Sequence, residues 1–138
     1  MTAFVQHTAS IPIQAKQASK PCAPCDSKVS WGLRIPSTNA LEVGAPIELS
    51  FCLAGRQIQA SGHVDHCTCM GDRFEIFVRF SSLVDCHKAR QGEQVCQMEQ
   101  WLQTQTAQGR KLEREQAYAE WLSLFAASFP GIENLSAA

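Results

Sequence analysis

The sequence has no apolar run approaching the roughly 20 residues of a membrane span, and residues 1–10 contain neither the basic region nor the apolar stretch of a secretory leader. It also has almost no net charge, because 12 Lys and Arg against 13 Asp and Glu leave a formal charge of −1. Such a chain has no overall field to hold a nucleic acid or an anionic membrane surface. We therefore expect a cytoplasmic protein without membrane insertion or nucleic-acid binding.

Catalytic motifs are missing as well. The chain has no glycine-rich phosphate loop, no Gly-x-Ser-x-Gly motif and no His-Glu-x-x-His motif. Asp85, Cys86 and His87 are adjacent in the sequence, but sequence neighbours are rarely catalytic partners, and these three fall where the last predicted strand meets a helix. The pattern favours a surface helix cap. We expect no catalytic residues and no enzymatic activity.

Cysteine is the residue type in excess, with seven in 138 residues and no regular framework. Because a cytoplasmic protein keeps its thiols reduced, free thiols are the favoured prediction. The alternative is a zinc-stabilised module, since Cys22-Ala-Pro-Cys25 has the spacing of half a zinc site and a second cluster could complete it. That second cluster consists of His63, His66, Cys67 and Cys69. The chain has no second Cys-x-x-Cys, so we predict no bound metal.

Apolar and polar residues alternate in several short segments, the pattern of half-buried strands. Four such segments without an intervening helix predict an antiparallel meander that closes into a small barrel or packs under a helix. The polar residues 1–10 predict a flexible arm, and Ile11-Pro12-Ile13 predicts a short edge strand because proline cannot donate to a ladder. The alternating apolar positions are Trp31, Leu33 and Ile35; Ile47, Leu49, Phe51 and Leu53; Ile58, Ala60, Gly62 and Val64; and Phe74, Ile76, Val78 and Phe80.

From Lys88 to Ser128 the chain has no proline and is rich in helix-forming residues. Val95, Met98 and Leu102 form a first apolar stripe that can lie against the strands. Gly109 favours a break, since glycine costs about 1 kcal/mol relative to alanine inside a helix. One long helix and two helices both remain open.

A second apolar stripe follows and ends at Pro130 and Gly131. It belongs either to the core or to a surface that binds a partner or a second copy, because the first stripe already supplies a helix for the strands. We predict the second stripe as the interaction surface. Its members are Tyr118, Trp121, Leu122, Phe125 and Phe129.

Three phrases occur in an order and spacing that resemble the PilZ domain family: Gly32-Leu-Arg-Ile35, Val43-Gly-Ala-Pro-Ile-Glu-Leu49 and Val78-Arg-Phe80. The resemblance covers about residues 6–102. It implies a six-stranded antiparallel β-barrel followed by a helix. It also implies a bacterial protein linked to cyclic di-GMP, which many members of that family bind.

The family's binding pattern is an Arg-x-x-x-Arg pair ahead of the first strand and an Asp/Asn-x-Ser-x-x-Gly turn on the next. Here Gly32 takes the glycine position, while Asp26 and Ser27 supply the acid and the hydroxyl with one inserted residue. The two arginine positions carry no cation, because no arginine occurs before Arg34. Each lost charge-assisted contact forfeits about 1.5–3 kcal/mol, so two losses predict binding weaker by about 100-fold or more.

The sequence thus predicts a mainly β protein with C-terminal helices, divided into a flexible arm (1–10), a PilZ-like barrel (11–88), a helical extension (89–130) and a tail (131–138). We expect an atypical PilZ protein that acts as a non-enzymatic adaptor, with no cofactor and weak or absent cyclic di-GMP binding. Its partner would be a protein or a second copy. The alternative is a genuine cyclic di-GMP receptor that uses Asp26, Ser27, Gly32 and Arg34 with Arg56 or Arg73.

Overall fold

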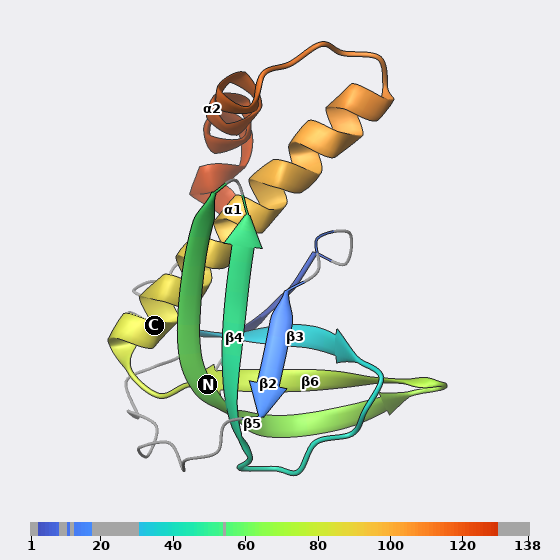
Figure 1. The fold of residues 1–138 in the computed structure, drawn as a ribbon, viewed down its shortest axis with the longest axis vertical. Coiled ribbons are helices and arrows are strands. Elements are labelled where there is room, and N and C mark those ends of the chain that lie inside the picture. Colours follow the sequence, from blue (N-terminus) through green and yellow to red (C-terminus); the bar gives the residue numbers. More distant parts are fainter. Residues whose placement is uncertain (1–2, 9–10, 12, 18–30, 54, 130–138) are drawn as a thin grey trace.

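A computed structural model describes residues 3–8, 11, 13–17, 31–53 and 55–129. These residues form six strands followed by two α-helices and one turn of 3-10 helix (Figure 1). The strands make one mixed sheet in the order β1-β3-β6-β5-β4-β2, in which β1 is parallel to β3 and every other neighbouring pair is antiparallel. The strands are β1 (Ala3–Gln6), β2 (Gln14–Gln17), β3 (Trp31–Ser37), β4 (Pro46–Leu53), β5 (Arg56–Met70) and β6 (Arg73–Phe80).

The four predicted meander strands are confirmed as β3 to β6, and their alternation matches the observed burial. On β3, Trp31, Leu33 and Ile35 are all buried, and on β4, Leu49 is fully buried. Their neighbours in sequence face the other side of the sheet, as the period of two requires. The strand β5 is longer than predicted and has a β-bulge near Val64, which allows it to pair with β4 over one half and with β6 over the other.

The sheet is open, so the prediction of a closed antiparallel barrel is wrong for the residues that the structure describes. Closure would require the two edge strands β1 and β2 to pair with each other, and they do not pair in the described residues. The chain between them turns inward, because His7 and Ile11 are each only 3% exposed. A connection buried at both points cannot act as the turn of a β1–β2 hairpin.

The N-terminal residues also differ from the sequence-based expectation. Ala3–Gln6, predicted as part of a flexible arm, form the parallel edge strand β1. Ile11 and Ile13, predicted as a short strand, lie outside any strand, and β2 begins at Gln14 instead. Asp26, Ser27 and the tail 131–138 lie outside the described residues.

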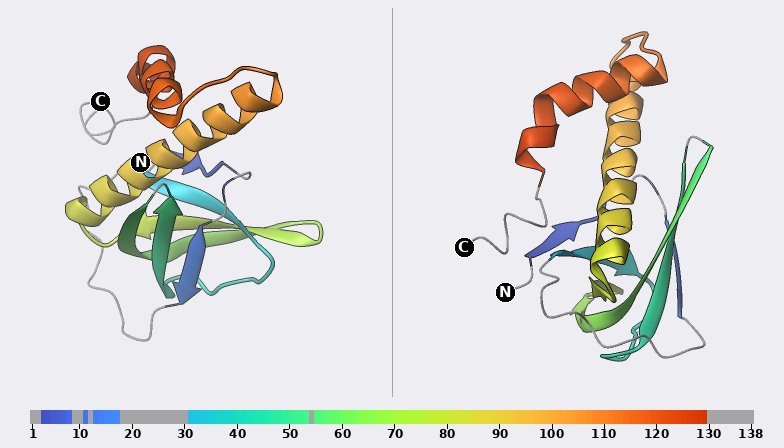
Figure 2. Two further views of the ribbon diagram at one scale, coloured as in Figure 1. Left: turned by 45° about the horizontal axis from the view of Figure 1, so that its top comes forward. Right: turned by 90° about the vertical axis from the view of Figure 1, so that its left-hand side faces the viewer.

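The helix α1 (Leu83–Ala107) covers the concave face of the sheet (Figure 2). Ser82 caps its N-terminus by accepting a hydrogen bond from the backbone N–H of Asp85. This confirms a cap at this point, although Cys86 next to it is buried rather than at the surface. None of the described helices is both long enough and apolar enough to cross a membrane.

The helical region is two helices. After α1 the chain reverses at Gly109, whose φ of 92° lies in the left-handed region that glycine tolerates best. The helix α2 (Arg114–Phe125) then lies beside the C-terminal half of α1 and continues into the 3-10 turn η1 (Ala126–Ser128). Two ion pairs hold this arrangement: Arg110 in the connection between the helices pairs with Glu120 of α2 at 2.6 Å, and Arg114 of α2 pairs with Glu99 of α1 at 2.9 Å.

Gly92 sets how closely α1 approaches the sheet. A Cβ atom at this position would lie 2.6 Å from Cγ of Phe51, which is itself only 2% exposed. The ring of Phe51 has no room to move away from such a Cβ atom, because protein interiors are close-packed. The absence of a side chain at Gly92 is therefore a packing requirement.

We predict that Gly92→Ala destabilises the protein by about 1–2 kcal/mol, because overpacking outweighs the better helix propensity of alanine. Urea denaturation measures the change. The exposed neighbour Gln91 provides the control, and Gln91→Ala should stay within about 0.5 kcal/mol of the parent. Adding Phe51→Leu to Gly92→Ala should recover part of the loss, and an unchanged or increased stability of Gly92→Ala alone would contradict the packing argument.

Candidate functional site

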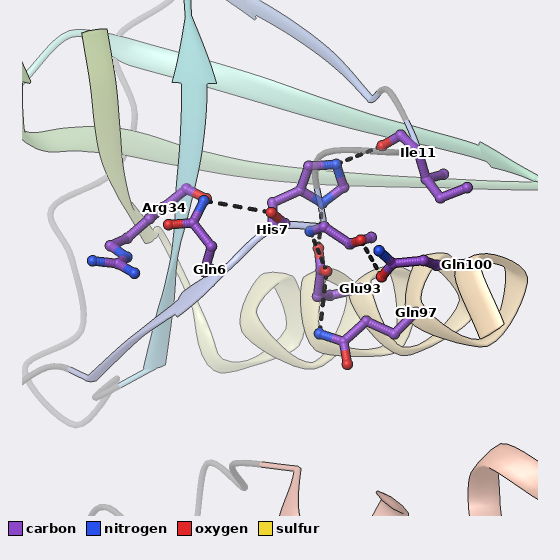
Figure 3. Close-up of polar contacts among 8 residues, drawn as sticks. Gln6, His7, Ile11, Arg34, Glu93, Gln97 and Gln100 are labelled. Carbon is purple, nitrogen blue, oxygen red and sulfur yellow. Dashed lines mark hydrogen bonds and ion pairs between the residues drawn. The ribbon is translucent and has the colours of Figure 1, made fainter. Parts of the chain in front are cut away.

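A buried polar contact joins the N-terminal segment to α1 (Figure 3). Nδ1 of His7 lies 2.5 Å from Oε1 of Glu93, and Nε2 of His7 lies 2.6 Å from the carbonyl oxygen of Ile11. His7 is 3% exposed and Glu93 is 0% exposed. The two residues are 86 positions apart in the sequence, so this contact ties the start of the chain to the middle of the helix.

The partners of His7 define where its protons lie. A carbonyl oxygen can only accept, so the Nε2–H of His7 donates to Ile11. The other carboxylate oxygen of Glu93 accepts from the backbone N–H of Thr8 at 3.1 Å and from the amide of Gln97 at 3.4 Å. That oxygen thus accepts two hydrogen bonds. The geometry is that of a histidine and a glutamate closely hydrogen-bonded to each other in a buried environment.

Cys96 lies next to this pair and completes the one group of three potential metal ligands found among the described residues, with ligand atoms within 4.8 Å of one another. Both ring nitrogens of His7 are hydrogen-bonded to oxygens in this arrangement. Burial, and then the charge of Glu93, raise the pKa of the Cys96 thiol to about 12. A high thiol pKa disfavours the thiolate that a metal would require.

The described part of the chain does not bring the ligands of the predicted zinc site together. Cys22 and Cys25 lie outside the described residues. His63, His66, Cys67 and Cys69 all lie on β5, but they do not form a group of three ligands within the described residues.

The helical stripe predicted as an interaction surface is divided between core and surface. Trp121 and Phe129 are 4% and 7% exposed and belong to the hydrophobic core. Tyr118 is partly buried and donates a hydrogen bond to Glu99 at 2.6 Å; burial first and this bond second raise the pKa of Tyr118 to about 12. Leu122 and Phe125 remain exposed, at 48% and 38%.

A cavity lies where β1, α1, α2 and η1 meet. Its volume is about 340 Å³, within the range of small-molecule sites. Three residues of the predicted stripe line it, and Trp101 of α1 makes an edge contact with Phe125 at a centroid distance of 5.2 Å. The lining residues are Val5, Gln97, Gln100, Trp101, Thr104, Trp121, Phe125, Ser128 and Phe129.

The sheet face opposite α1 carries Gly32 and Arg34, the described members of the predicted ligand site. The ring of Phe4 covers Gly32, because a Cβ there would lie 2.7 Å from that ring. Phe4 also makes an edge contact with the ring of Phe77, at a centroid distance of 5.1 Å. Arg34 forms an ion pair with Glu75 at 3.2 Å and lies over the ring of Phe77.

The two other arginines considered for a dinucleotide site are not brought together. Arg56 begins β5, whereas Arg73 pairs with Met70 at the opposite end of that strand. A strand rises about 3.3 Å per residue, so a 15-residue strand separates them too far for both to hold one small ligand.

No family model matches this chain, and no curated protein or solved structure matches it either. The resemblance to PilZ domains therefore stays a prediction from the quoted residues.

Sequence reasoning missed both members of the buried pair. The sequence did contain a signal that Glu93 is buried, because it falls on the same helical face as Ala89 and Cys96, at spacings of four and three. A charged residue on a buried face requires a buried partner. His7 had no such signal, because a lone histidine among polar residues does not point to a core position. Only the fold shows that Glu93 and His7 are partners.

We predict that Glu93→Gln costs about 3 kcal/mol of stability, because it removes the carboxylate partner of the buried His7 ring. Denaturation curves measure the loss. Glu115→Gln makes the same chemical change at an exposed position of α2 and should have an effect below about 0.5 kcal/mol. Equal stabilities of the two variants would rule out a buried ion pair.

We also predict that the Cys96 thiol is inert in the folded protein. With a pKa of about 12, only about one thiol in 10⁴ is ionised at pH 8, and each pH unit upward raises that fraction tenfold. Alkylation at pH 8 followed by peptide mass spectrometry should modify exposed Cys52 rapidly, and Cys96 only after denaturation. Modification of Cys96 as fast as Cys52 in the folded protein would contradict this.

Proposed function

We propose that this protein is a non-enzymatic adaptor in bacterial cyclic di-GMP-related signalling, an atypical PilZ-like protein with weak or no binding of the dinucleotide itself. It acts in the cytoplasm by contacting a partner protein through α2. Motility, pili and secreted polysaccharide are the processes that the resemblance implies. The observation that carries the proposal is the contact of Phe4 with Gly32.

Gly32 is where the resemblance places the close approach of a ligand to the backbone. In this chain the space above Gly32 holds the ring of Phe4, from the neighbouring strand β1. A nucleotide would have to displace that ring and its contacts with His66 and Phe77. The glycine thus serves strand packing, which supports the proposed loss of binding.

Arg34, the cation nearest to Gly32 in sequence, is also engaged. Its ion pair with Glu75 and its position over the ring of Phe77 would both be lost if it turned to a phosphate. The acidic Glu75 beside it further disfavours an anionic ligand. These contacts support weak rather than tight dinucleotide binding.

The partner surface is the apolar patch on α2 formed by Leu122 and Phe125, which are neighbours at i and i+3 and are 48% and 38% exposed; Leu124, 58% exposed, flanks Phe125. Three side chains are few compared with the roughly 20–30 residues that each partner contributes to a stable interface. The patch therefore favours a transient contact with an apolar segment of another protein over a permanent dimer of this chain. Such a contact suits an adaptor that must release its partner.

Isothermal titration calorimetry with cyclic di-GMP tests the proposal. We expect no saturable heat below about 100 μM dinucleotide, because two forked cations are missing. A PilZ receptor that binds the dinucleotide serves as the positive control in the same buffer. Binding at micromolar or lower concentration would replace the adaptor with a sensor.

Sedimentation of the same sample completes the test. We expect the mass of a single chain, in agreement with a patch that is too small for a permanent dimer. A stable dimer that dissociates on Leu122→Asp would assign the patch to self-association and contradict the proposed partner.

A further inference from the structure

The contact between His7 and Glu93 brings two metal-ligating atoms face to face (Figure 3). The Nε2–H of His7 donates to the carbonyl oxygen of Ile11 at 2.6 Å, so Nδ1 is the nitrogen that faces Oε1 of Glu93, 2.5 Å away. Without a metal, a single proton lies between these two atoms. An imidazole nitrogen and a carboxylate oxygen are both common zinc ligands, so a zinc ion can replace that proton.

Cys96 brings a third ligand to the same point. Glu93 and Cys96 are at i and i+3 on α1, so their side chains lie on one face of the helix. The ligand atoms of His7, Glu93 and Cys96 all lie within 4.8 Å of one another. Ligands of a tetrahedral zinc ion are about 3.3–3.6 Å apart when the bonds are about 2.0–2.3 Å. Side-chain shifts of about 1 Å therefore suffice to form the site.

The outer hydrogen bonds that a metal site requires are already made. The carbonyl of Ile11 fixes the tautomer and the ring orientation of His7. The second oxygen of Glu93 accepts from the backbone N–H of Thr8 at 3.1 Å and from the amide of Gln97 at 3.4 Å. Metal-binding histidines and carboxylates are held by contacts of this kind. Oε1 of Glu93 is thus oriented toward the imidazole and away from these donors.

The three ligand atoms favour zinc over other cations. Calcium and magnesium take oxygen ligands, and Cu(I) takes soft sulfur ligands, whereas zinc accepts nitrogen, oxygen and sulfur together. One carboxylate and one thiolate carry two negative charges, so a dication makes the complex neutral. Neutrality matters here because His7 is 3% exposed and Glu93 and Cys96 are 0% exposed.

The Cys96 thiol must lose its proton to bind zinc. Burial, and then the charge of Glu93, hold the pKa of this thiol at about 12 when no metal is bound. Zinc itself removes the proton from a coordinating thiol, so binding displaces this proton as well as the one between His7 and Glu93. Competition with two protons makes the affinity lower than that of zinc-finger peptides, and we expect a Kd of about 1 μM.

We propose that Nδ1 of His7, Oε1 of Glu93 and Sγ of Cys96 form a zinc site that fastens the N-terminal segment to α1. Water takes the fourth position of the tetrahedral ion. The site is buried, so the metal enters as the chain folds. It differs from the alternative built on Cys22 and Cys25 and does not depend on the proposed adaptor function.

X-ray absorption by bound zinc tests the ligand set without any variant. The intact chain is reduced, unfolded in urea and refolded with one equivalent of Zn²⁺. We expect one zinc per chain, with one sulfur neighbour at about 2.3 Å and nitrogen or oxygen neighbours at about 2.0–2.2 Å. No stoichiometric uptake, or a spectrum with no sulfur or with two, would overturn the proposal.

Refolding with Co²⁺ in place of Zn²⁺ identifies the cysteine. A cobalt–thiolate bond gives a charge-transfer band in the near ultraviolet, and we expect Cys96→Ser to abolish it. The same variant should weaken zinc binding by about 100-fold or more, since even an outer contact is worth about 10–100-fold. Circular dichroism verifies that the variant is folded, and the zinc spectrum of the parent decides the question if it is not.

Two controls make the assignment specific. Cys86 is equally buried on the same helix but is not in the group of ligands, so Cys86→Ser should keep the zinc affinity within about threefold. The double variant Cys22→Ser/Cys25→Ser removes the rival half-site and should also keep it within about threefold. Loss of zinc in the double variant would assign the metal to the Cys-x-x-Cys motif. Equal losses in Cys86→Ser and Cys96→Ser would likewise overturn the proposed site.

Discussion

The buried contact between His7 and Glu93 is the constraint on which the arrangement of edge strand, helix and cavity depends. Two ionisable groups are taken out of water and are satisfied by each other, by the backbone of Thr8 and Ile11 and by the amide of Gln97. Such a pair is costly to separate, because either group alone would remain desolvated without a counter-charge. The N-terminal segment is therefore held against α1, and the sheet cannot close through a β1–β2 hairpin.

The same contact shapes the cavity. Val5 precedes His7 on the N-terminal segment, and Gln97 and Gln100 follow Glu93 on α1, and all three contribute to the cavity wall. The hydroxyl of Thr8 also bonds to the side chain of Gln100. One polar interaction thus fixes two walls, while the reversal at Gly109 brings α2 and η1 to form the others.

The two faces of the sheet have different roles. The concave face is filled by α1, with Phe51 packed against Gly92. The opposite face carries the contact of Phe4 with Gly32 and the engaged Arg34. Gly32 and Arg34 are thus both in contact with the chain's own side chains, and the apolar residues exposed on α2 lie elsewhere on the molecule.

The sequence by itself determined the four central strands and their core faces, because these follow from local alternation. It favoured a break at Gly109 through glycine's backbone freedom but left one helix or two open. It did not determine the edges of the sheet. β1 and β2 have only four residues each, and their pairing comes from partners far along the chain. Only the tertiary structure decided that His7 meets Glu93, that Trp121 and Phe129 are core while Leu122 is exposed, and that Phe4 covers Gly32. Each of these depends on a long-range contact, and residue order carries no local signal for which distant group will be the partner.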